Sequence, residues 1–455
     1  MLLMKLWNTL KHIQLENKKA FFLIGVGGIG MSSIAQHLIF KGHNVFGYDR
    51  NSSSITDLLE EKGVLITYSH SVNYLIKGYN VDNIKVIYSA AIKINHPVFK
   101  FFIDRGCLPI KRSVFLASLV NETESFAVAG THGKTTTSAI LTHIFKKTDT
   151  SFSSFVGGVM LPEKTNYIHN GFDKTIVEAD EFDRSFLNLK PHFACITSID
   201  ADHLDIYKNH GQLKAAFIDF SKKVQNKLIL HHSIPIDGIS YRLNTNADYE
   251  FKNINQTKDG YFVDLKTPNE YVSKIFCKVL GKYNLENMLA ALALADQSGK
   301  PLVNIIQSLG SFHGILRRMN SYNLDGKIII DDYAHHPTEI ASVHKALREK
   351  YPDSFIEAVF QPHLFSRTRD FMNDFAYQLS KFDSVKLMKI YPAREDPIKG
   401  VNSEKILKKI TTKASLLERK DFNKNLDLTK ADVIAVLGAG SIGNNISEYI
   451  KEKSI

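Results

Sequence analysis

The sequence has few cysteines, a single tryptophan and no long hydrophobic run. Only 3 of its 455 residues are cysteines, and their wide spacing excludes a disulfide framework or a zinc-binding cysteine motif. We therefore expect Cys107, Cys195 and Cys277 to be buried thiols in a reducing compartment. No apolar stretch reaches the roughly 18 residues that a membrane-spanning helix needs, and the N-terminal residues lack the sustained apolar core of a secretory signal. These absences predict a cytoplasmic protein with no membrane span.

The charge balance is basic but carries no pattern typical of nucleic-acid binding. The formal net charge is +10, from 57 Lys and Arg against 47 Asp and Glu. The lysines are scattered, and no segment combines a basic stripe with aromatic side chains that could stack on bases. We therefore expect no nucleic-acid partner. With 44% hydrophobic and 23% charged residues, a chain of this length is typical of a globular protein of two to four domains.

The most informative motif is a loop of glycine and threonine between an apolar strand and a helical pattern. We expect the strand over 125–129 and the helix to continue over 139–145. A helix that begins directly after a glycine loop points unpaired backbone N–H groups at one place, and its dipole favours an anion there. Lys134 would add a positive charge for the β- and γ-phosphates of a nucleotide, and the Thr135 hydroxyl could ligate Mg²⁺. The residues of this loop predicted to bind the nucleotide are Gly130, Thr131, His132, Gly133, Lys134, Thr135 and Thr136.

A second glycine loop follows the first predicted strand of the chain. It leads into a helical stretch over 31–40 and a strand over 44–49, which together form a β-α-β unit. Such a unit binds NAD or another nucleotide diphosphate, or serves only as a structural turn. The candidate ligand-binding residues here are Gly25, Gly27, Gly28, Gly30 and Asp49. A later glycine sequence over 438–443 has too few residues after it for a second such unit, so we expect a strand-to-helix turn there.

Two acidic segments follow predicted buried strands of the middle region. Glu178 to Glu181 follow the strand over 174–178, and Asp200 to Asp205 follow the strand over 193–198. Ligands of parallel α/β sheets bind at the carboxyl ends of the strands, and Mg²⁺ prefers hard oxygen ligands. The acidic residues could instead form a solvated surface. Beside the phosphate loop, however, they predict a magnesium site.

Strands alternate with helical patterns along the whole chain, which predicts an α/β fold with mostly parallel sheets. We expect three domains, over 1–120, 121–312 and 313–455. Between about residues 225 and 280 the sequence pattern predicts a β-rich insertion in the middle domain.

Several of these motifs together resemble the Mur ligase and folylpolyglutamate synthase superfamily. The phosphate loop has Val128 where the common phosphate loop has its first glycine, and the shorter form from Gly130 to Thr135 is similar to the loop of this superfamily. The glycine loop at Gly25, the segment from Val177 to Leu187 and the segment from Thr197 to Tyr207 are similar to those of its Mur ligase members. The resemblance implies a Rossmann-like UDP-sugar domain, a central ATPase domain of the P-loop type and a Rossmann-like C-terminal domain.

The resemblance also implies roles for residues outside the two loops. Glu178 and His203 would bind the metal together with Thr135, and Asn284 and Asn287 would lie beneath the adenine of ATP. In the C-terminal region the resemblance assigns Tyr333, His335 and Arg367 to the incoming amino acid, with Arg367 binding its carboxylate. Our own candidates there are Arg317 for substrate binding and His335 as the base that takes the ammonium proton. Two positions depart from the family pattern, where Tyr283 replaces a histidine and Leu364 replaces an arginine.

The activity that the resemblance implies is ATP-dependent amide formation in peptidoglycan synthesis. L-alanine would be joined to the lactyl carboxylate of UDP-N-acetylmuramate through an acyl phosphate, with ATP and Mg²⁺ as cofactors. The nearest alternative is the ligase that recycles a tripeptide onto the same sugar. A folylpolyglutamate synthase, an NAD-dependent dehydrogenase and a non-catalytic nucleotide-binding module are more distant alternatives. We expect a monomer or a weak homodimer.

Overall fold

The computed structural model describes residues 20–200, 207, 210–393 and 395–453, and these form two compact units. The first unit contains the chain up to residue 242 together with residues 246–249 and 290–308. The second contains residues 243–245, 250–289 and the chain from residue 309 onward. Among the described residues, no helix is both long enough and apolar enough to cross a bilayer.

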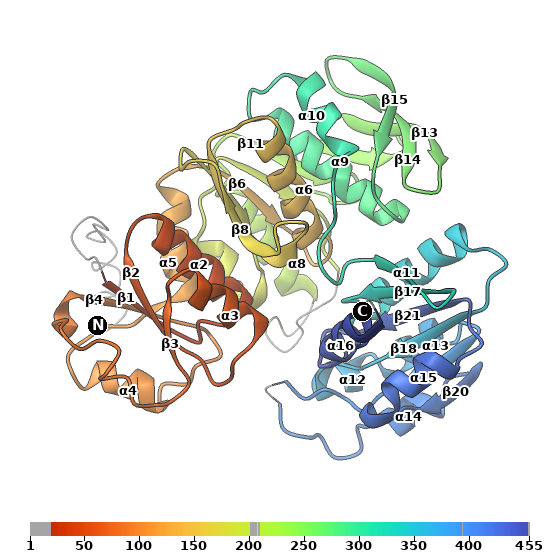
Figure 1. Ribbon diagram of the computed structural model, residues 1–455. Coiled ribbons are helices and arrows are strands. Elements are labelled where there is room, and N and C mark those ends of the chain that lie inside the picture. Colours follow the sequence, from red (N-terminus) through yellow and green to blue (C-terminus); the bar gives the residue numbers. More distant parts are fainter. Residues whose placement is uncertain (1–19, 201–206, 208–209, 394, 454–455) are drawn as a thin grey trace. The chain divides into compact units, whose positions relative to one another are not determined.

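The N-terminal part of the first unit is a five-stranded parallel sheet in the order β3-β2-β1-β4-β5 (Figure 1). Every residue of the central strand, Ala20–Ile24, is buried, because helices cover both faces of the sheet. Helices α2, α3 and α5 pack on one face, and α4 packs on the other. The elements are β1 (Ala20–Ile24), α2 (Ile29–Phe40), β2 (Asn44–Tyr48), α3 (Ser54–Glu61), β3 (Leu65–Thr67), η3 (Val81–Asn83), β4 (Ile84–Tyr88), α4 (Pro97–Ile103), β5 (Ile110–Lys111) and α5 (Arg112–Asn121).

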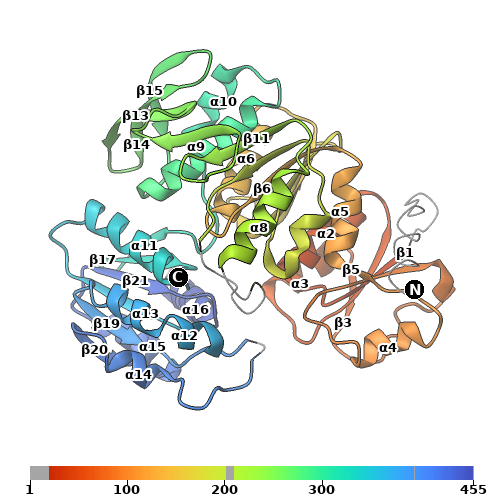
Figure 2. The ribbon, with the colours of Figure 1, turned by 180° about the vertical axis from the view of Figure 1, so that it is seen from behind.

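The middle sheet has the strand order β15-β14-β13-β12-β11-β10-β6-β9-β7-β8. Strand β6 lies between β10 and β9 and is parallel to both, so the loops after these three strands meet at one edge of the sheet. Helix α6 follows β6 and packs on one face of the sheet, and helix α8 packs on the other face (Figure 2). The first elements are β6 (Glu124–Ala129), α6 (Lys134–Lys147), β7 (Phe152–Met160), β8 (Thr165–His169), β9 (Lys174–Glu178), η4 (Phe182–Asn188), β10 (Phe193–Ile196) and α8 (His210–Ser221). The later elements are β11 (Lys227–His231), β12 (Ile239–Leu243), β13 (Tyr249–Gln256), β14 (Tyr261–Lys266), β15 (Tyr271–Cys277), α9 (Lys282–Asp296) and α10 (Leu302–Leu309).

The C-terminal sheet has six strands in the order β16-β17-β21-β18-β19-β20, of which β16 runs antiparallel to β17 and the others are parallel. Helices α11 and α13 pack on one face, and α15 and α16 on the other. The strands are β16 (Asn320–Leu324), β17 (Lys327–Asp332), β18 (Ile356–Phe360), β19 (Ser384–Leu387), β20 (Lys413–Leu416) and β21 (Val433–Leu437). The helices are α11 (Pro337–Lys350), α12 (Phe365–Asp370), α13 (Met372–Leu379), α14 (Ser403–Leu407), η5 (Arg419–Asp421), α15 (Phe422–Leu428) and α16 (Ile442–Lys453).

These elements confirm the predicted α/β fold and correct one detail. The expected strands over 174–178 and 327–332 are β9 and β17, and the late glycine sequence is a strand-to-helix turn between β21 and α16. All three cysteines are free thiols, and two are buried as expected. Cys107 is only half-buried, because it lies in the loop between α4 and β5 with its thiol near the carbonyl of Val81.

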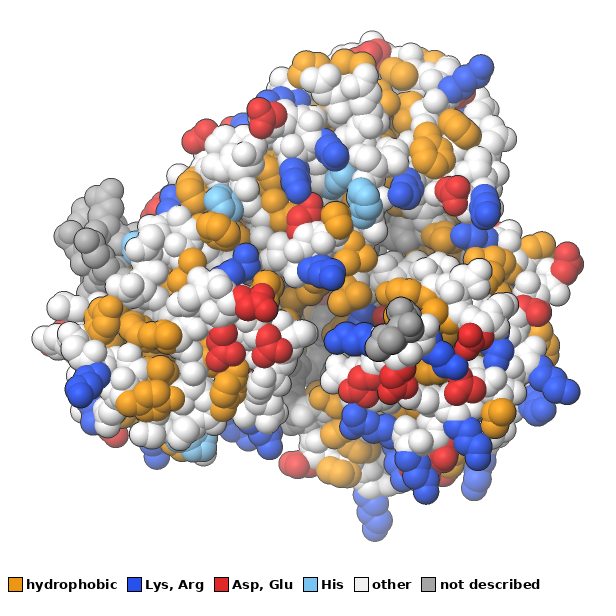
Figure 3. Space-filling model, in the orientation of Figure 1, with side chains coloured by type: hydrophobic (Ala, Val, Ile, Leu, Met, Phe, Trp, Pro, Cys, Tyr) orange, Lys and Arg blue, Asp and Glu red, His pale blue; other side chains and the backbone are white. Residues whose placement is uncertain are grey.

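The face shown in Figure 3 carries Lys and Arg side chains interspersed with Asp and Glu, and they do not form one basic stripe on that face. On that face, therefore, the positive side chains lie among carboxylates.

Candidate active site

The phosphate loop connects the carboxyl end of β6 to the first turn of α6. Gly130 has a φ of 134°, and a Cβ at this position would lie 2.1 Å from the Thr197 hydroxyl, so only glycine fits. Gly133 is the N-cap of α6 with a φ of 83°, which also favours glycine. The end of β10 supports the loop, because the backbone N–H of His132 donates to the Ser198 hydroxyl at 2.9 Å. The loop is therefore held from the neighbouring strand, and α6 begins directly behind it.

Lys134 is held by the carboxylate of a buried residue, Glu181. Its ammonium donates to the carbonyl of Gly130 at 2.5 Å and lies 2.8 and 3.0 Å from the two carboxylate oxygens of Glu181. Glu181 is fully buried. Burial alone would lower the pKa of the Lys134 ammonium, but the charge of Glu181 outweighs burial and raises that pKa. Lys134 is therefore a fixed positive charge at the mouth of the loop.

Glu178 lies at the carboxyl end of β9 beside Thr135. The Thr135 hydroxyl donates to Glu178 Oε1 at 2.9 Å, and the backbone N–H of Gly157 donates to Oε2 at 2.7 Å. A Cβ at Gly157 would lie 2.4 Å from Oε2, so glycine makes room for the carboxylate. Burial raises the pKa of Glu178, and the nearby Lys134 opposes part of that shift. The pair brings two hard oxygen donors together, which is the donor set that Mg²⁺ prefers.

The third expected metal ligand, His203, lies outside the described residues. Among the residues that the structure does describe, no group of three or more His, Cys, Asp or Glu is arranged to hold a metal ion. Two of the three predicted metal ligands, Thr135 and Glu178, therefore lie side by side.

The N-terminal glycine loop connects β1 to α2 and is fixed by Asp49. The Asp49 carboxylate accepts a hydrogen bond from the backbone N–H of Gly27 at 2.7 Å. A Cβ at Gly30, in the first turn of α2, would lie 2.8 Å from the Arg112 guanidinium. Asp49 thus holds the loop in shape, and Arg112 adds a positive charge beside the start of α2, where the helix dipole already favours an anion.

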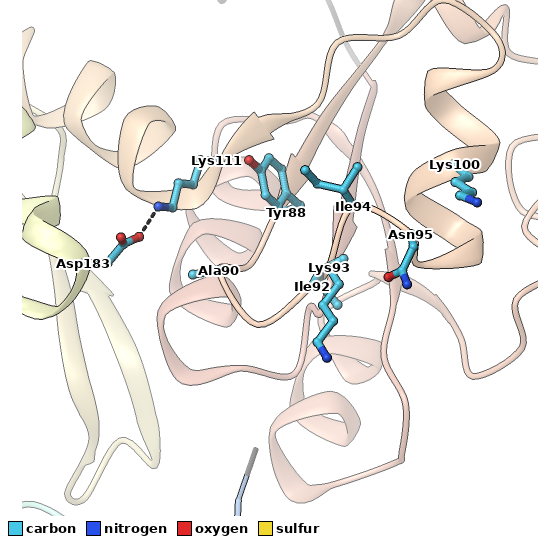
Figure 4. A pocket seen from close by; sticks show the side chains of 9 residues that line it. All are labelled: Tyr88, Ala90, Ile92, Lys93, Ile94, Asn95, Lys100, Lys111 and Asp183. Atoms are coloured by element: carbon cyan, nitrogen blue, oxygen red, sulfur yellow. Dashed lines mark hydrogen bonds and ion pairs between the residues drawn. The ribbon is translucent and has the colours of Figure 1, made fainter. Parts of the chain in front are cut away.

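A cavity of about 610 Å³ lies beside this loop, beyond the end of β4 (Figure 4). Ile92 is one of its walls and also lies 3.7 Å from where a Cβ of Gly25 would be, so the cavity and the glycine loop share a side chain. The lining is Tyr88, Ala90, Ile92, Lys93, Ile94, Asn95, Lys100, Lys111 and Asp183. Three lysines in one lining favour an anionic ligand.

In the second unit, the two asparagines of α9 are both buried near the start of the helix. The Asn284 amide donates to the carbonyl of Leu280 at 2.8 Å, and the Asn287 amide donates to Asn284 Oδ1 at 3.3 Å. Tyr283, between them and Leu280, packs against the hydrophobic core of the C-terminal sheet. Burial raises the pKa of its phenol well above the ordinary value, so Tyr283 is a neutral side chain.

Arg317 is anchored inside the C-terminal domain. Its guanidinium lies 3.3 Å from the Asp331 carboxylate and donates to the carbonyl of Gly438. A Cβ at Gly443 would lie 2.2 Å from the same guanidinium. Gly443, in the first turn of α16, therefore makes room for the arginine, while Cβ atoms at Gly438 and Gly440 would meet Gln361.

The neighbouring polar cluster lies at the end of β17. Asp332 accepts the backbone N–H groups of Met319 and Ala334, each at 2.8 Å. Burial raises the Asp332 pKa to about 6, against the opposing charge of Arg318. Arg318 also lies over the Tyr333 ring, 5.3 Å from its centroid.

His335 has one ring nitrogen fixed by its neighbours. Its Nδ1 lies 3.0 Å from the carbonyl of Tyr333 and 3.1 Å from Glu339 Oε2. Both neighbours are acceptors, so Nδ1 carries the proton in the neutral ring and Nε2 has the free lone pair. This is the tautomer that a general base needs at Nε2.

Arg367 is buried and lies in the short helix α12, which begins directly after Leu364. Leu364 has a φ of 71° and a ψ of 138°, a backbone conformation that residues other than glycine rarely adopt. Its backbone is held there because its N–H donates to the carbonyl of Tyr391 at 2.9 Å and its own carbonyl accepts from the Thr368 hydroxyl at 2.7 Å. The turn that presents Arg367 is thus a constrained one.

Comparison with known proteins matches most of the chain to one family. Family models match residues 21–123 (Mur ligase family, catalytic domain), 128–295 (Mur ligase middle domain) and 317–440 (Mur ligase, glutamate ligase domain). A UDP-N-acetylmuramate–L-alanine ligase from Christiangramia forsetii is 42% identical over 96% of this chain and 98% of its own length. The chain belongs to the Mur ligase family.

Two further proteins show how far the likeness extends. The Flavobacterium psychrophilum UDP-N-acetylmuramate–L-alanine ligase is 44% identical over 95% of this chain and 98% of its own length. The crystal structure of a UDP-N-acetylmuramate–alanine ligase from Thermotoga maritima superposes with a TM-score of 0.81 at 25% identity, covering 96% of this chain and 99% of that one. The three-domain α/β architecture is therefore that of the Mur ligases, and this chain is a ligase.

Sequence reasoning missed several residues that hold the phosphate loop or line the N-terminal cavity. It placed Glu181 in an acidic segment but did not identify it as the partner of Lys134. It gave no role to Thr197 and Ser198, which hold the phosphate loop, or to Lys111, which lines the N-terminal cavity. A polar Thr-Ser pair directly after a buried strand was a signal from which these loop contacts could have been predicted. The partner of Lys134 could not have been predicted, because the sequence contains several carboxylates that could pair with it.

Proposed function

We propose that this chain joins L-alanine to the lactyl carboxylate of UDP-N-acetylmuramate with the hydrolysis of ATP to ADP and phosphate. The observation that carries the proposal is the phosphate loop with Lys134 and the Thr135–Glu178 pair at one sheet edge, within a chain that matches alanine-adding ligases over almost its full length. The two substrates in this proposal are those that the names of the relatives give, UDP-N-acetylmuramate and L-alanine. A tripeptide in place of alanine is the alternative, and no observation favours it.

ATP would bind with its terminal phosphates in the loop at the start of α6. The backbone N–H groups of that first turn and the ammonium of Lys134 would neutralise the charge that develops on the γ-phosphate. Asn284 and Asn287 would contact the base, with their side chains pre-oriented by the hydrogen bond between them. Tyr283 replaces the family histidine and is committed to the C-terminal core. We therefore assign the contact to the two asparagines alone.

Mg²⁺ fits the oxygen pair that Thr135 and Glu178 form 2.9 Å apart. These two residues would hold the ion, with His203 as the third ligand. When bound, Mg²⁺ supplies positive charge to the phosphate oxygens and to the reacting carboxylate. The chain's own part is to keep Glu178 in place, and the N–H of Gly157 does this.

UDP-N-acetylmuramate would bind in the N-terminal part. Its diphosphate would lie at the glycine loop and the start of α2, near Arg112, and the adjoining cavity with its three lysines would take the remaining anionic and sugar groups. This assigns Gly25, Gly27, Gly28, Gly30 and Asp49 to ligand binding, with Asp49 acting by holding the Gly27 N–H and the loop geometry.

Alanine would be bound by residues of the C-terminal domain. Arg367 would bind its carboxylate, and Tyr333 would lie beside the amino acid. His335 Nε2 is the proposed acceptor of the ammonium proton, because Nδ1 is occupied by its neighbours. Arg317 is anchored by Asp331 and Gly438. Its contribution to the substrate would come through its position rather than through a free guanidinium.

The reaction would follow in two steps. The lactyl carboxylate oxygen attacks the γ-phosphorus of ATP, and the bond from that phosphorus to the bridging oxygen breaks, which releases ADP and gives an acyl phosphate. The alanine nitrogen then attacks the acyl carbon, and the tetrahedral intermediate expels inorganic phosphate as the amine loses its proton. Because an acyl phosphate hydrolyses readily, the site must exclude water during both steps.

One assay tests the proposal. Phosphate release is measured with ATP, Mg²⁺ and UDP-N-acetylmuramate, supplied with L-alanine, serine, glycine or the tripeptide. The proposal expects phosphate release that depends on the sugar and is fastest with L-alanine. Release with the tripeptide but not with alanine would assign the recycling reaction, and release without any sugar would remove the proposed acceptor.

Three further proposals concern the compartment, the oligomeric state and the domain division. We propose a cytoplasmic site of action, since the substrate ATP and the free thiols fit a reducing compartment. We also propose a monomer or a weak homodimer. The functional division is proposed at 1–120, 121–312 and 313–455, for the sugar, ATP and amino acid, respectively.

A further inference from the structure

The turn after β9 connects the phosphate loop to the N-terminal cavity through two ion pairs. At one end, Glu181 contacts the Lys134 ammonium at 2.8 Å. Two residues later, Asp183 forms an ion pair with Lys111, and both of these residues line the cavity (Figure 4). The other lining residues belong to the segment 88–111, so Asp183 is the contribution of the middle domain to that cavity. One short turn thus carries a carboxylate to each of the two sites.

The two ion pairs differ in how easily an incoming ligand can exchange them. The side chains of Lys134 and Glu181 are 13% and 0% exposed, whereas those of Lys111 and Asp183 are 34% and 44% exposed. Exposed pairs are weak and readily replaced, while a buried carboxylate keeps its partner. An anion that enters the cavity can therefore take Lys111 from Asp183 without first disturbing Lys134.

The turn is tightly built, so a change at one end reaches the other. The backbone N–H of Arg184 donates to the carbonyl of Glu181 at 3.0 Å, and the Tyr207 hydroxyl donates to the same carbonyl at 2.6 Å. Asp183 and Arg184 have φ values of 55° and 53°, two consecutive left-handed residues that are not glycine. Such a backbone persists only where surrounding contacts hold it, and the ion pair to Lys111 is one of those contacts.

We propose that Asp183 is a positioning residue that couples the N-terminal cavity to the phosphate loop. Its ion pair with Lys111 holds the turn that keeps Glu181 on Lys134, and an anionic ligand that binds Lys111 loosens that hold. Lys134 then becomes available to the nucleotide phosphates. This inference rests on the proposed function, since it takes the UDP-sugar as the ligand. Because binding linkage is reciprocal, each ligand should raise the affinity for the other by the same factor.

The test is the affinity for a non-hydrolysable ATP analogue, measured by calorimetry with and without saturating UDP-N-acetylmuramate. In the unmodified protein the sugar should tighten nucleotide binding by about 5-fold or more. Asp183→Asn removes the charge while retaining a residue that tolerates the left-handed conformation. In this variant the sugar-free affinity should approach that of the unmodified protein with sugar, and the coupling factor should fall to about 1.

The matched control is Glu163→Gln. It also removes one carboxylate from a partly exposed ion pair of the middle domain, that with Lys146, and it lies outside both sites. Its nucleotide affinity and coupling factor should equal those of the unmodified protein, which excludes a general effect of net charge on ATP binding. A purely structural role of Asp183 would weaken nucleotide binding in Asp183→Asn, which is the opposite sign.

Each outcome decides the inference. If the unmodified protein binds the UDP-sugar but shows no coupling, or if the coupling survives in Asp183→Asn, the inference is overturned. If the unmodified protein does not bind the UDP-sugar, the proposed function fails, and the sugar-free measurement still decides the present inference. In that case tighter nucleotide binding by Asp183→Asn than by the unmodified protein supports it, and equal or weaker binding overturns it.

Discussion

Lys134 has two roles that a pair of variants can separate. It is the positive charge of the phosphate loop and the counter-ion of the buried Glu181 carboxylate. At 2.8 Å and an effective dielectric of about 20, the gross attraction between the two charges is about 6 kcal/mol, against which the cost of dehydrating both groups is set. Removing Lys134 alone leaves an uncompensated charge inside the protein.

We therefore expect Lys134→Met to lose both activity and stability. The loss of stability should be about 3–5 kcal/mol, the usual cost of leaving one partner of a buried pair uncompensated. The double variant Lys134→Met with Glu181→Gln has no uncompensated charge and should regain most of that loss. Both variants should lose about 100-fold or more in kcat, because neither has the ammonium that stabilises the transferred phosphoryl group.

Urea unfolding followed by circular dichroism gives the stabilities, and phosphate release in the presence of UDP-N-acetylmuramate and alanine gives kcat. Glu181→Gln alone completes the cycle and measures the coupling between the two side chains. A folded double variant with near-normal kcat would refute the role of Lys134 in phosphoryl transfer. Equal stabilities of the single and double lysine variants would refute the ion-pair argument.

Three further predictions concern the phosphate loop, the proposed metal ligand Glu178 and a buried histidine. Gly130→Ala places a Cβ 2.1 Å from the Thr197 hydroxyl at a φ of 134°, so we expect a loss of about 2 kcal/mol or more in unfolding free energy together with weaker nucleotide binding, and an unchanged melting temperature would contradict this. Glu178→Gln should raise the Mg²⁺ concentration needed for half-maximal activity by about 10-fold or more, and an unaltered magnesium titration would remove Glu178 from the metal site. Burial, and then the charge of Lys41, lowers the pKa of His37 from 6.5 to about 3, so its ring stays neutral in the fold while the unfolded chain binds a proton below about pH 6.5. Stability should therefore fall as the pH falls from 6.5 towards 3, by at most about 1.4 kcal/mol per pH unit from this group, and His37→Gln should flatten that slope in urea unfolding at a series of pH values; an identical slope would show that His37 is not responsible.

Much of the fold could be predicted because the signals are local. Strand β9 and strand β17 have the predicted bounds, since each is an apolar run that needs burial on both faces. The phosphate loop follows the same logic, because a glycine turn before a helix presents its N–H groups whatever the rest of the chain does. The amino-acid order thus determined the three α/β segments, the position of Lys134 at the start of α6, and the strand ends that carry Glu178.

The partners of these residues were decided only by the tertiary structure. Lys134 meets Glu181 across 47 positions, Lys111 meets Asp183 across 72, and Arg317 reaches the carbonyl of Gly438 across 121. Each contact depends on which strands are neighbours and on where a missing Cβ leaves room, and sequence spacing carries neither fact. The physical reason is that a buried charge must find a counter-charge somewhere in the fold, but the sequence alone does not say which of many carboxylates lies within reach.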